Sequence, residues 1–136
     1  MHKSILTIAL ALSAFNAQAA TIPDDVAVRC ILGEAQGEGL ESIRDHASAL
    51  RNRGYIKGVY GCKADISKDI PYLKAKGIYN HAIKSWNESA AVDTVNGADH
   101  WGSTLLNEDK AWIQKMERSG YTLTKTTKNT AFYRSK

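Results

Sequence analysis

The sequence predicts a mainly α-helical domain (α+β) with a minor extended element. Three observations indicate this. Apolar residues recur at helical spacing in several segments, glycines stand where those segments end, and the late stretch GYTLTKTTKNTAFYR is rich in threonine and aromatic residues. Because β-branched and aromatic residues favour extended chain, we expect helices along most of the sequence and a small extended element after residue 120.

The first helix should begin at an N-cap aspartate, Asp24 or Asp25, and end at Glu34. Gly37 and Gly39 follow it, and glycine both disfavours a helix interior and permits the turn that comes next. The apolar face of this helix would consist of Val26, Val28, Ile31 and Leu32.

A second helix is expected over residues 40–53, with Gly54 just beyond its end. Its apolar face would consist of Leu40, Ile43, Ala47 and Leu50. A broken helical segment should end in a helix near residues 78–89, and a further helix should cover residues 107–119. The polar stretch 91–103 between these two helices is predicted to be a loop.

Residues 1–20 are typical of a secretory signal peptide. They contain Lys3 near the start, an apolar core from Ile5 to Phe15, and the small-x-small sequence Ala17-Gln18-Ala19, which predicts cleavage near Ala19 or Ala20. The apolar core is short for a membrane crossing, which takes roughly 20 residues, so an anchored protein is the weaker interpretation. We expect export to the periplasm or the extracellular cell wall, with no stable membrane span after cleavage.

Residues 21–136 would then form one domain, because they contain no linker-like stretch, internal repeat or low-complexity tract. This part keeps both cysteines of the chain, Cys30 and Cys62, in a compartment where disulfides persist. A Cys30–Cys62 disulfide is the favoured interpretation, and two separate buried thiols are the alternative.

The charge of the chain argues against nucleic acid as a partner. The formal net charge of +4 falls to +3 when one lysine, Lys3, leaves with the signal peptide. The basic residues are spread along the chain, whereas nucleic-acid binding usually needs a basic patch. A mild positive charge suits an anionic cell-wall polymer and serves solubility equally well.

The segment GEAQGEG sets two carboxylates, Glu34 and Glu38, four residues apart among glycines. Glu34 would stand at the C-terminal end of an apolar helix, where the helix dipole and the apolar neighbours both disfavour an ionised carboxylate. A carboxylic acid that keeps its proton near neutral pH can donate it to a leaving glycosidic oxygen. On spacing alone, a solvated surface charge is the alternative interpretation.

Three motifs resemble a known family. The stretch ILGEAQGEG, followed later by HASALRNRG, resembles the GEARGE segment and NR pair that open the catalytic domain of the spore-cortex-lytic type of bacterial cell wall hydrolase, which has a lysozyme-like fold. DTVNGADHWGS resembles that family's TNGA loop, and NTAFYR is similar to its GNHxFY ending. The motifs occur in the family's order and together cover nearly the whole of residues 21–136.

The resemblance implies roles for individual residues. Glu34 would be the general acid, Glu38 a positional or substrate-contacting residue, and Asn52 part of the NR pair. Asn96 would belong to the loop that lines the sugar groove, and Tyr133 to the closing aromatic pair. Enzymes of this kind cut the bond between N-acetylmuramic acid and N-acetylglucosamine, many of them as lytic transglycosylases that form an anhydro end without water. That reaction needs one carboxylate, acting first as acid and then as base.

The sequence also departs from the family pattern. Gln36 stands where arginine is usual, Gly39 replaces a proline, and Asp99 with His100 replaces an apolar or aromatic stretch. Because Asp99 and His100 lie on a polar loop, we weigh them as part of the sugar groove. Trp101 follows them and is expected to stack on a sugar ring, with a loop anchor as its alternative role.

The remaining histidines and tryptophans suggest no further site. The histidines lack HxxxH or HxH spacing, so no metal site and no cofactor are predicted. His46 is expected to be a surface or half-buried residue on the second helix, and Trp86 and Trp112 are expected to pack in the core.

With the resemblance, the sequence predicts an exported peptidoglycan glycosidase, either a lytic transglycosylase or a muramidase-like hydrolase, with Glu34 as general acid and base. The alternative is a non-catalytic peptidoglycan-binding or wall-associated interaction protein on the same fold. An anhydro and a hydrated product both stay open, as does the help of an envelope partner protein.

Overall fold

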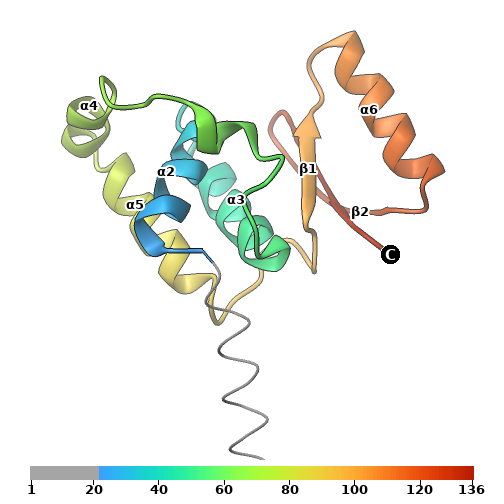
Figure 1. Ribbon diagram of the computed structural model, residues 1–136, viewed down its shortest axis with the longest axis horizontal. Coiled ribbons are helices and arrows are strands. Elements are labelled where there is room, and N and C mark those ends of the chain that lie inside the picture. The colour runs from blue at the N-terminus through green and yellow to red at the C-terminus, as the bar shows by residue number, and fades with distance from the viewer. Residues whose placement is uncertain (1–21) are drawn as a thin grey trace, which may run out of the picture.

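The helices follow the predicted order, but the end of the predicted loop 91–103 is a strand, because residues 100–103 pair with residues 130–133 of the late extended stretch. In the computed structural model, which describes residues 22–136, the helices are α2 (Asp24–Ala35), α3 (Leu40–Arg53), the 3₁₀ helix η1 (Tyr60–Lys63), α4 (Ile70–Ala75), α5 (Ile78–Glu88) and α6 (Asn107–Arg118). The strands are β1 (His100–Ser103), β2 (Thr122–Thr127) and β3 (Thr130–Arg134) (Figure 1). The prediction of a mainly α-helical α+β domain is confirmed, and the predicted signal peptide lies outside the described residues. Within residues 22–136, no helix combines the length and apolar character that a bilayer crossing requires.

The start of α2 corrects one prediction. Its N-cap is Pro23, so a cap at Asp24 or Asp25 is wrong, and both aspartates lie in the first turn, where negative charge complements the helix dipole. The Asp24 carboxylate has another partner, since its Oδ1 accepts a hydrogen bond of 2.7 Å from Trp86 Nε1. This bond ties the beginning of α2 to α5.

A glycine turn separates α2 from α3. Helix α2 ends at Ala35, and Gly39 has a φ of 95°, a conformation that side-chain-bearing residues rarely adopt. Glu34 therefore lies in the last turn of α2, whereas Glu38 lies in the turn that follows. The two carboxylates do not share one helix face.

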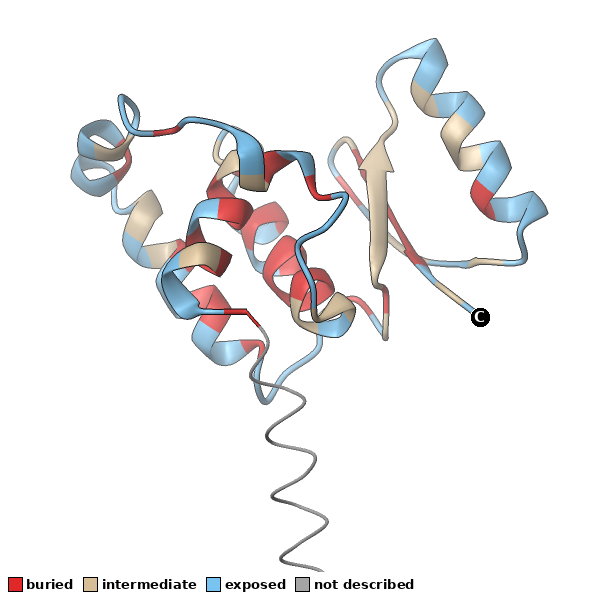
Figure 2. Ribbon diagram, viewed as in Figure 1, coloured by how far each residue is buried: buried red, intermediate tan, exposed pale blue. Residues whose placement is uncertain are grey.

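We call α2, α3, η1, α4 and α5 the helical half. Buried apolar residues of α2, α3, α4 and α5 form its core, and Figure 2 shows the buried residues of these helices in red. Trp86 is buried there, as predicted. Leu40 is 55% exposed and does not belong to the predicted apolar face, because it is the first residue of α3 beside the turn. His46 is buried rather than half-exposed, since Trp101 and Phe132 pack against its ring and its Nδ1 reaches the Ser42 carbonyl at 2.7 Å.

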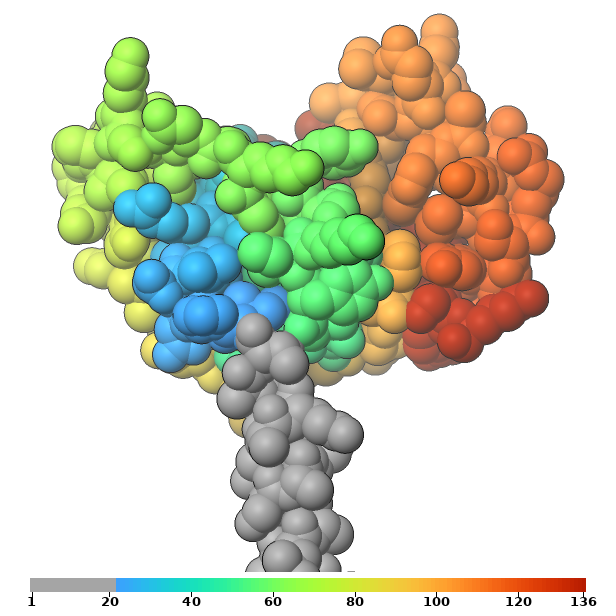
Figure 3. Space-filling view, viewed as in Figure 1, coloured from blue at the N-terminus to red at the C-terminus, as the bar shows by residue number. Residues whose placement is uncertain are grey.

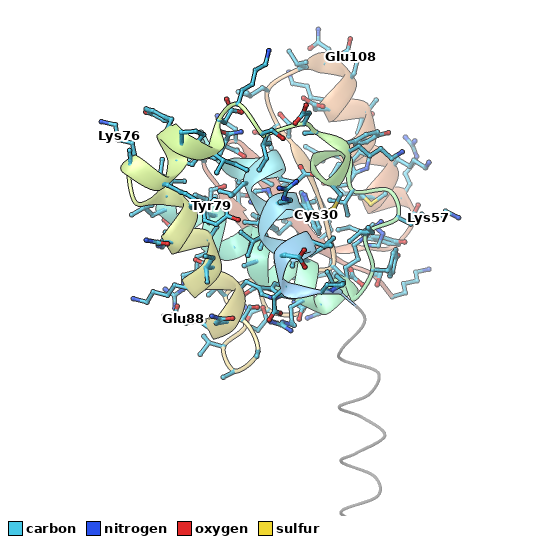
Figure 4. The ribbon with its side chains drawn as sticks, turned by 60° about the vertical axis from the view of Figure 1, so that its left-hand side comes forward. Cys30, Lys57, Lys76, Tyr79, Glu88 and Glu108 are labelled. Carbon is cyan, nitrogen blue, oxygen red and sulfur yellow. A yellow bond between two sulfur atoms is a disulfide. The ribbon has the colours of Figure 1, made fainter. Side chains whose placement is uncertain are left out.

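A disulfide joins Cys30 on α2 to Cys62 in η1, so the two cysteines are not separate thiols. Cys30 lies on α2 inside the helical half, whereas Lys57 and Lys76 project from the surface (Figure 4). The bond closes a loop with a sequence separation of 32 residues. In the chain-entropy model, a loop of that length stabilises the folded state by roughly 3 to 4 kcal/mol.

The sheet half consists of β1, α6, β2 and β3 and lies beside the helical half (Figure 1). Its strands are antiparallel in the order β1-β3-β2, so the described chain offers no strand partner for the outer edge of β1. Helix α6 packs on β1 and β2. The buried apolar clusters here are small: one contains Met116, Ala131 and Tyr133, and the other contains Ala49, Val95, Ala98 and Phe132.

Polar contacts around Asp45, which is buried on α3, join the two halves. Its Oδ1 accepts hydrogen bonds from Thr94 Oγ1 at 2.6 Å and Lys125 Nζ at 3.0 Å, and its Oδ2 accepts one from Thr127 Oγ1 at 2.5 Å. Burial alone would lower the pKa of Lys125, but its bonds to Asp45 and Glu41 outweigh burial and raise it. A buried carboxylate is therefore fully partnered at the junction.

Candidate functional site

A cavity of about 550 Å³ is lined by residues of both halves. The end of α2, the loop before η1 and the end of α3 form one side, and all of β1 with the first turns of α6 forms the other. Figure 3 shows the surface hollowed between the segment near residue 60 and the segment that carries β1 and α6. Four residues that the sequence singles out line this cavity: Glu34, Glu38, His100 and Trp101.

The Glu34 side chain is half-buried at the C-terminal end of α2. Its Oε1 accepts a hydrogen bond of 2.9 Å from the backbone N–H of Gly61 in η1. No other hydrogen bond to this carboxyl group occurs among residues 22–136. The carboxyl group is thus oriented through one oxygen, while the other has no hydrogen-bond partner in the described part of the chain.

Two glycines allow η1 to approach α2 this closely. A Cβ atom on Gly61 would lie 2.6 Å from Glu34 Cγ and 2.8 Å from the Cys30 carbonyl oxygen, and one on Gly33 would strike the Gly61 carbonyl. The Cys30–Cys62 disulfide fastens the same contact, since Cys62 follows Gly61 in the chain. The disulfide and the glycine contact therefore hold the donor that orients Glu34.

Two further carboxyl groups line the cavity. Glu38 Oε1 accepts a hydrogen bond of 3.1 Å from Thr130 Oγ1, which links the turn after α2 to the start of β3. Asp109 lies in the first turn of α6, and its Oδ2 accepts a 3.0 Å hydrogen bond from the Leu106 N–H. Sequence reasoning missed Asp109, because its only local signal is that of a helix-capping residue.

Aromatic side chains form much of the cavity wall. Trp101 is half-buried and packs on the helical core as well as on the cluster around Phe132. Trp112 was expected in the core but is only half-buried, and its ring lies so close to Gly102 that a Cβ atom there would be 2.7 Å away. Tyr60, which sequence reasoning also missed, lines the cavity with 85% of its surface exposed.

Arg53 supplies a fixed positive charge at the cavity. Its Nη1 donates to the Asp99 carbonyl at 3.2 Å, its Nη2 donates to the Lys57 carbonyl at 2.7 Å, and the guanidinium lies over the Tyr55 ring. Arg53 Nε is buried and has no hydrogen-bond partner within the described part of the chain. The NR pair could have identified this residue, but sequence reasoning assigned a role only to Asn52.

His100 and Asp99 form a pair at the start of β1. His100 Nδ1 lies 3.0 Å from Asp99 Oδ1, and both Asp99 oxygens also accept hydrogen bonds from Ser135. Burial would raise the pKa of Asp99, but the bonds from Ser135 and His100 outweigh burial and lower it. His100 lines the cavity, whereas Asp99 does not line it and contacts the His100 ring at Nδ1.

The other predicted substrate-binding residues do not line the cavity. Asn52 Nδ2 donates to the Asp93 carboxylate and to the Ala98 carbonyl, so it fixes the loop before β1. Asn96 has a φ of 49° on the exposed part of that loop, as a turn residue would. Tyr133 is buried in β3, where burial and nearby Glu117 raise its pKa.

No metal-binding group of three or more His, Cys, Asp or Glu side chains occurs among residues 22–136. Comparison of the chain with protein-family models, with curated proteins and with solved structures found no match.

Proposed function

We propose that the protein cleaves the glycan strands of peptidoglycan between N-acetylmuramic acid and N-acetylglucosamine, with Glu34 as the general acid. The observation that carries this proposal is the position of Glu34, half-buried in the wall of an open cavity and held through one oxygen by the Gly61 N–H. A single oriented carboxyl group beside a groove is the minimum that glycosidic bond cleavage requires.

The cavity wall suits a sugar chain. Sugar rings stack on aromatic faces, and Trp101, Trp112 and Tyr60 offer such surfaces on both sides. All four residues of β1 line the cavity, and the outer edge of this strand has no strand partner in the described chain. Backbone N–H and C=O groups at such an edge can bind the acetamido groups of both sugars.

In the proposed reaction, Glu34 donates its proton to the glycosidic oxygen as the bond to the anomeric carbon breaks. The attacking group is either water, which gives a reducing end, or the 6-hydroxyl of the muramic residue, which gives an anhydro end. Transglycosylation needs no second carboxylate. Hydrolysis with a second carboxylate would draw on Glu38 or Asp109, which share the cavity with Glu34.

The setting of the proposed activity is the cell wall outside the cytoplasm. The signal-peptide pattern of residues 1–20 supports export, and the disulfide is consistent with an oxidising compartment. An envelope partner protein that directs the enzyme to the wall stays a hypothesis. Pull-down from envelope extracts that recovers only wall sacculi would contradict it.

The test is mass spectrometry of the soluble products after the mature protein meets isolated sacculi. We expect muropeptides from the wild type and a loss of roughly 10² to 10⁴ in rate for Glu34→Gln, the range that general acid catalysis contributes. The control is Glu88→Gln, because Glu88 is exposed on α5, its side chain pairs with Lys84, and it does not line the cavity (Figure 4). This control should release products at the wild-type rate.

The alternative is a protein that binds the glycan without cutting it. In that case neither the wild type nor Glu34→Gln should release products, and both should sediment with sacculi. Anhydro products that depend on Glu34 would identify a lytic transglycosylase, and reducing ends would identify a hydrolase.

A further inference from the structure

The pair of residues that departs from the family pattern lies at the cavity itself. His100 is a cavity-lining residue of β1, and its Nδ1 lies 3.0 Å from Asp99 Oδ1. Each of the two side chains is 24% exposed, so the pair is largely shielded from solvent without being sealed from it. Such shielding strengthens an electrostatic contact relative to one in water.

Asp99 is held more firmly than an exposed loop aspartate needs to be. Ser135 donates its N–H to Oδ1 at 2.8 Å and its hydroxyl to Oδ2 at 2.5 Å. The backbone of Asp99 is fixed as well, since its N–H donates to the Tyr133 carbonyl and its carbonyl accepts from Arg53. The carboxylate therefore cannot turn away from His100 without breaking several bonds.

These contacts determine which imidazole nitrogen carries the proton. The hydrogen bonds to Asp99 lower its pKa, so its carboxylate is ionised near neutral pH and can only accept. His100 Nδ1 must then donate, and in the neutral ring Nε2 keeps its lone pair. No residue in the range 22–136 makes a hydrogen bond to this Nε2.

We propose that His100 is the base of the reaction and that Asp99 is its positioning residue. This inference rests on the proposed function. As the attacking hydroxyl oxygen bonds to the anomeric carbon, its proton passes to His100 Nε2, and the electron pair of the broken bond leaves with the glycosidic oxygen, which takes the proton of Glu34. His100 ends as imidazolium and Glu34 as carboxylate, and solvent exchanges the proton between them before the next turnover.

A structural role for the pair predicts different behaviour. Asp99 could serve only to fasten the chain after β3 through Ser135, with His100 as packing against the Tyr121 ring at 4.9 Å. In that case, substitution of His100 would change stability and leave the pH dependence of the rate unaltered. The titratable side chains in contact with His100 are Asp99 and Tyr121, and Tyr133 lies opposite it on β3. The other titratable or charged groups that line the cavity are Glu34, Glu38, Arg53, Tyr60 and Asp109.

The experiment measures the rate of product release from sacculi against pH for the wild type, Glu34→Gln, His100→Gln, His100→Ala and Asp99→Asn. The control is His81→Gln, because His81 lies on α5 and does not line the cavity. We expect His100→Gln to lose roughly 10² to 10⁴ in rate, the range for a general base. The rate of this variant should also no longer decrease toward acidic pH as that of the wild type does. Added imidazole should restore part of the activity of His100→Ala, and Asp99→Asn should be slowed while it still sediments with sacculi.

The outcomes separate the two proposals. An active wild type, an inactive Glu34→Gln and a His100→Gln variant with the wild-type rate and profile would overturn the role of His100 and leave the proposed function standing. The role of His100 as base would also be overturned, in favour of the structural role, if both His100 variants lost activity without rescue by imidazole and had equally lowered temperatures of thermal unfolding. A wild type that releases nothing from sacculi would overturn both.

Discussion

The two halves of the molecule are held together by different forces. The helical half has an extended apolar core and a disulfide, whereas the sheet half has small apolar clusters. The sheet half is joined to α3 by polar contacts around Asp45 and by the packing of Trp101 and Phe132 on His46. The proposed acid, Glu34, belongs to the first half, and the Asp99–His100 pair belongs to the second. One wall of the cavity is therefore fixed by a large apolar core and a disulfide, whereas the other is fixed by smaller apolar clusters together with hydrogen bonds.

Removal of the disulfide should lower the free energy of unfolding more than any other substitution considered below. The double variant Cys30→Ala, Cys62→Ala should lose roughly 3 to 4 kcal/mol in free energy of unfolding, because the unfolded chain regains the freedom of the closed loop. Urea denaturation measures this loss, and a reducing agent should lower the stability of the wild type but not of the double variant. A loss below about 1 kcal/mol would mean that the helical half depends on packing alone.

Substitution at Asp45 tests the polar junction. Asp45→Asn should lose about 2 to 3 kcal/mol, because it leaves partly buried donors, including the Lys125 ammonium, without their charged partner. The matched control is Glu41→Gln, since the Glu41 side chain is 71% exposed and also contacts Lys125, at 3.4 Å. The control should change stability by less than about 1 kcal/mol. Equal effects in urea denaturation would show that the buried network does not join the halves.

Gly102 tests how well the sheet half tolerates crowding. A methyl group there would lie 2.7 Å from the Trp112 ring, so Gly102→Ala should displace this ring and lose about 1 to 2 kcal/mol. Gly37→Ala is the control, because no heavy atom lies within 4 Å of the Cβ position that it creates. Tryptophan fluorescence and thermal unfolding report the two changes, and an unchanged emission spectrum in Gly102→Ala would contradict the expected displacement.

The smallest expected effect is the change with pH in the stability that the Lys125–Asp45 contact contributes. The pKa of Lys125 is raised above its usual 10.5 in the folded state, so its contribution to stability is complete below that pH. This contribution should be lost as pH rises through the raised value. The difference in free energy of unfolding between the wild type and Lys125→Met should therefore be constant from neutral pH to about pH 10 and then shrink. A difference that grows with alkaline pH would have the wrong sign for this contact.

The sequence predicted the helices well because local signals determine them. Glycines mark the ends of α2 and α3, and Gly54 takes up the left-handed conformation that closes α3. The Cys30–Cys62 pairing followed from the small number of cysteines and the predicted export of the chain. Glu34 was singled out by its place at the end of an apolar helix, which the structure retains.

Features that depend on distant contacts could not be predicted. His46 is buried because Trp101 and Phe132, far along the chain, pack on its ring. Nothing near Asp109 indicates that α6 will fold back along the cavity, and nothing near Gly61 indicates that its N–H will meet Glu34. Residues that matched by motif alone, such as Asn52, proved to fix a loop rather than line the cavity.

The irregular register of β2 has a consequence for the behaviour of the protein at high concentration. This strand forms one edge of the sheet, and its pairing with β3 shifts between Leu123 and Lys125. An open strand edge is a template for pairing with a second molecule, and a shift in register together with an inward-pointing lysine makes such pairing unfavourable. The same lysine that binds Asp45 therefore helps to keep neighbouring molecules from joining their sheets into fibres.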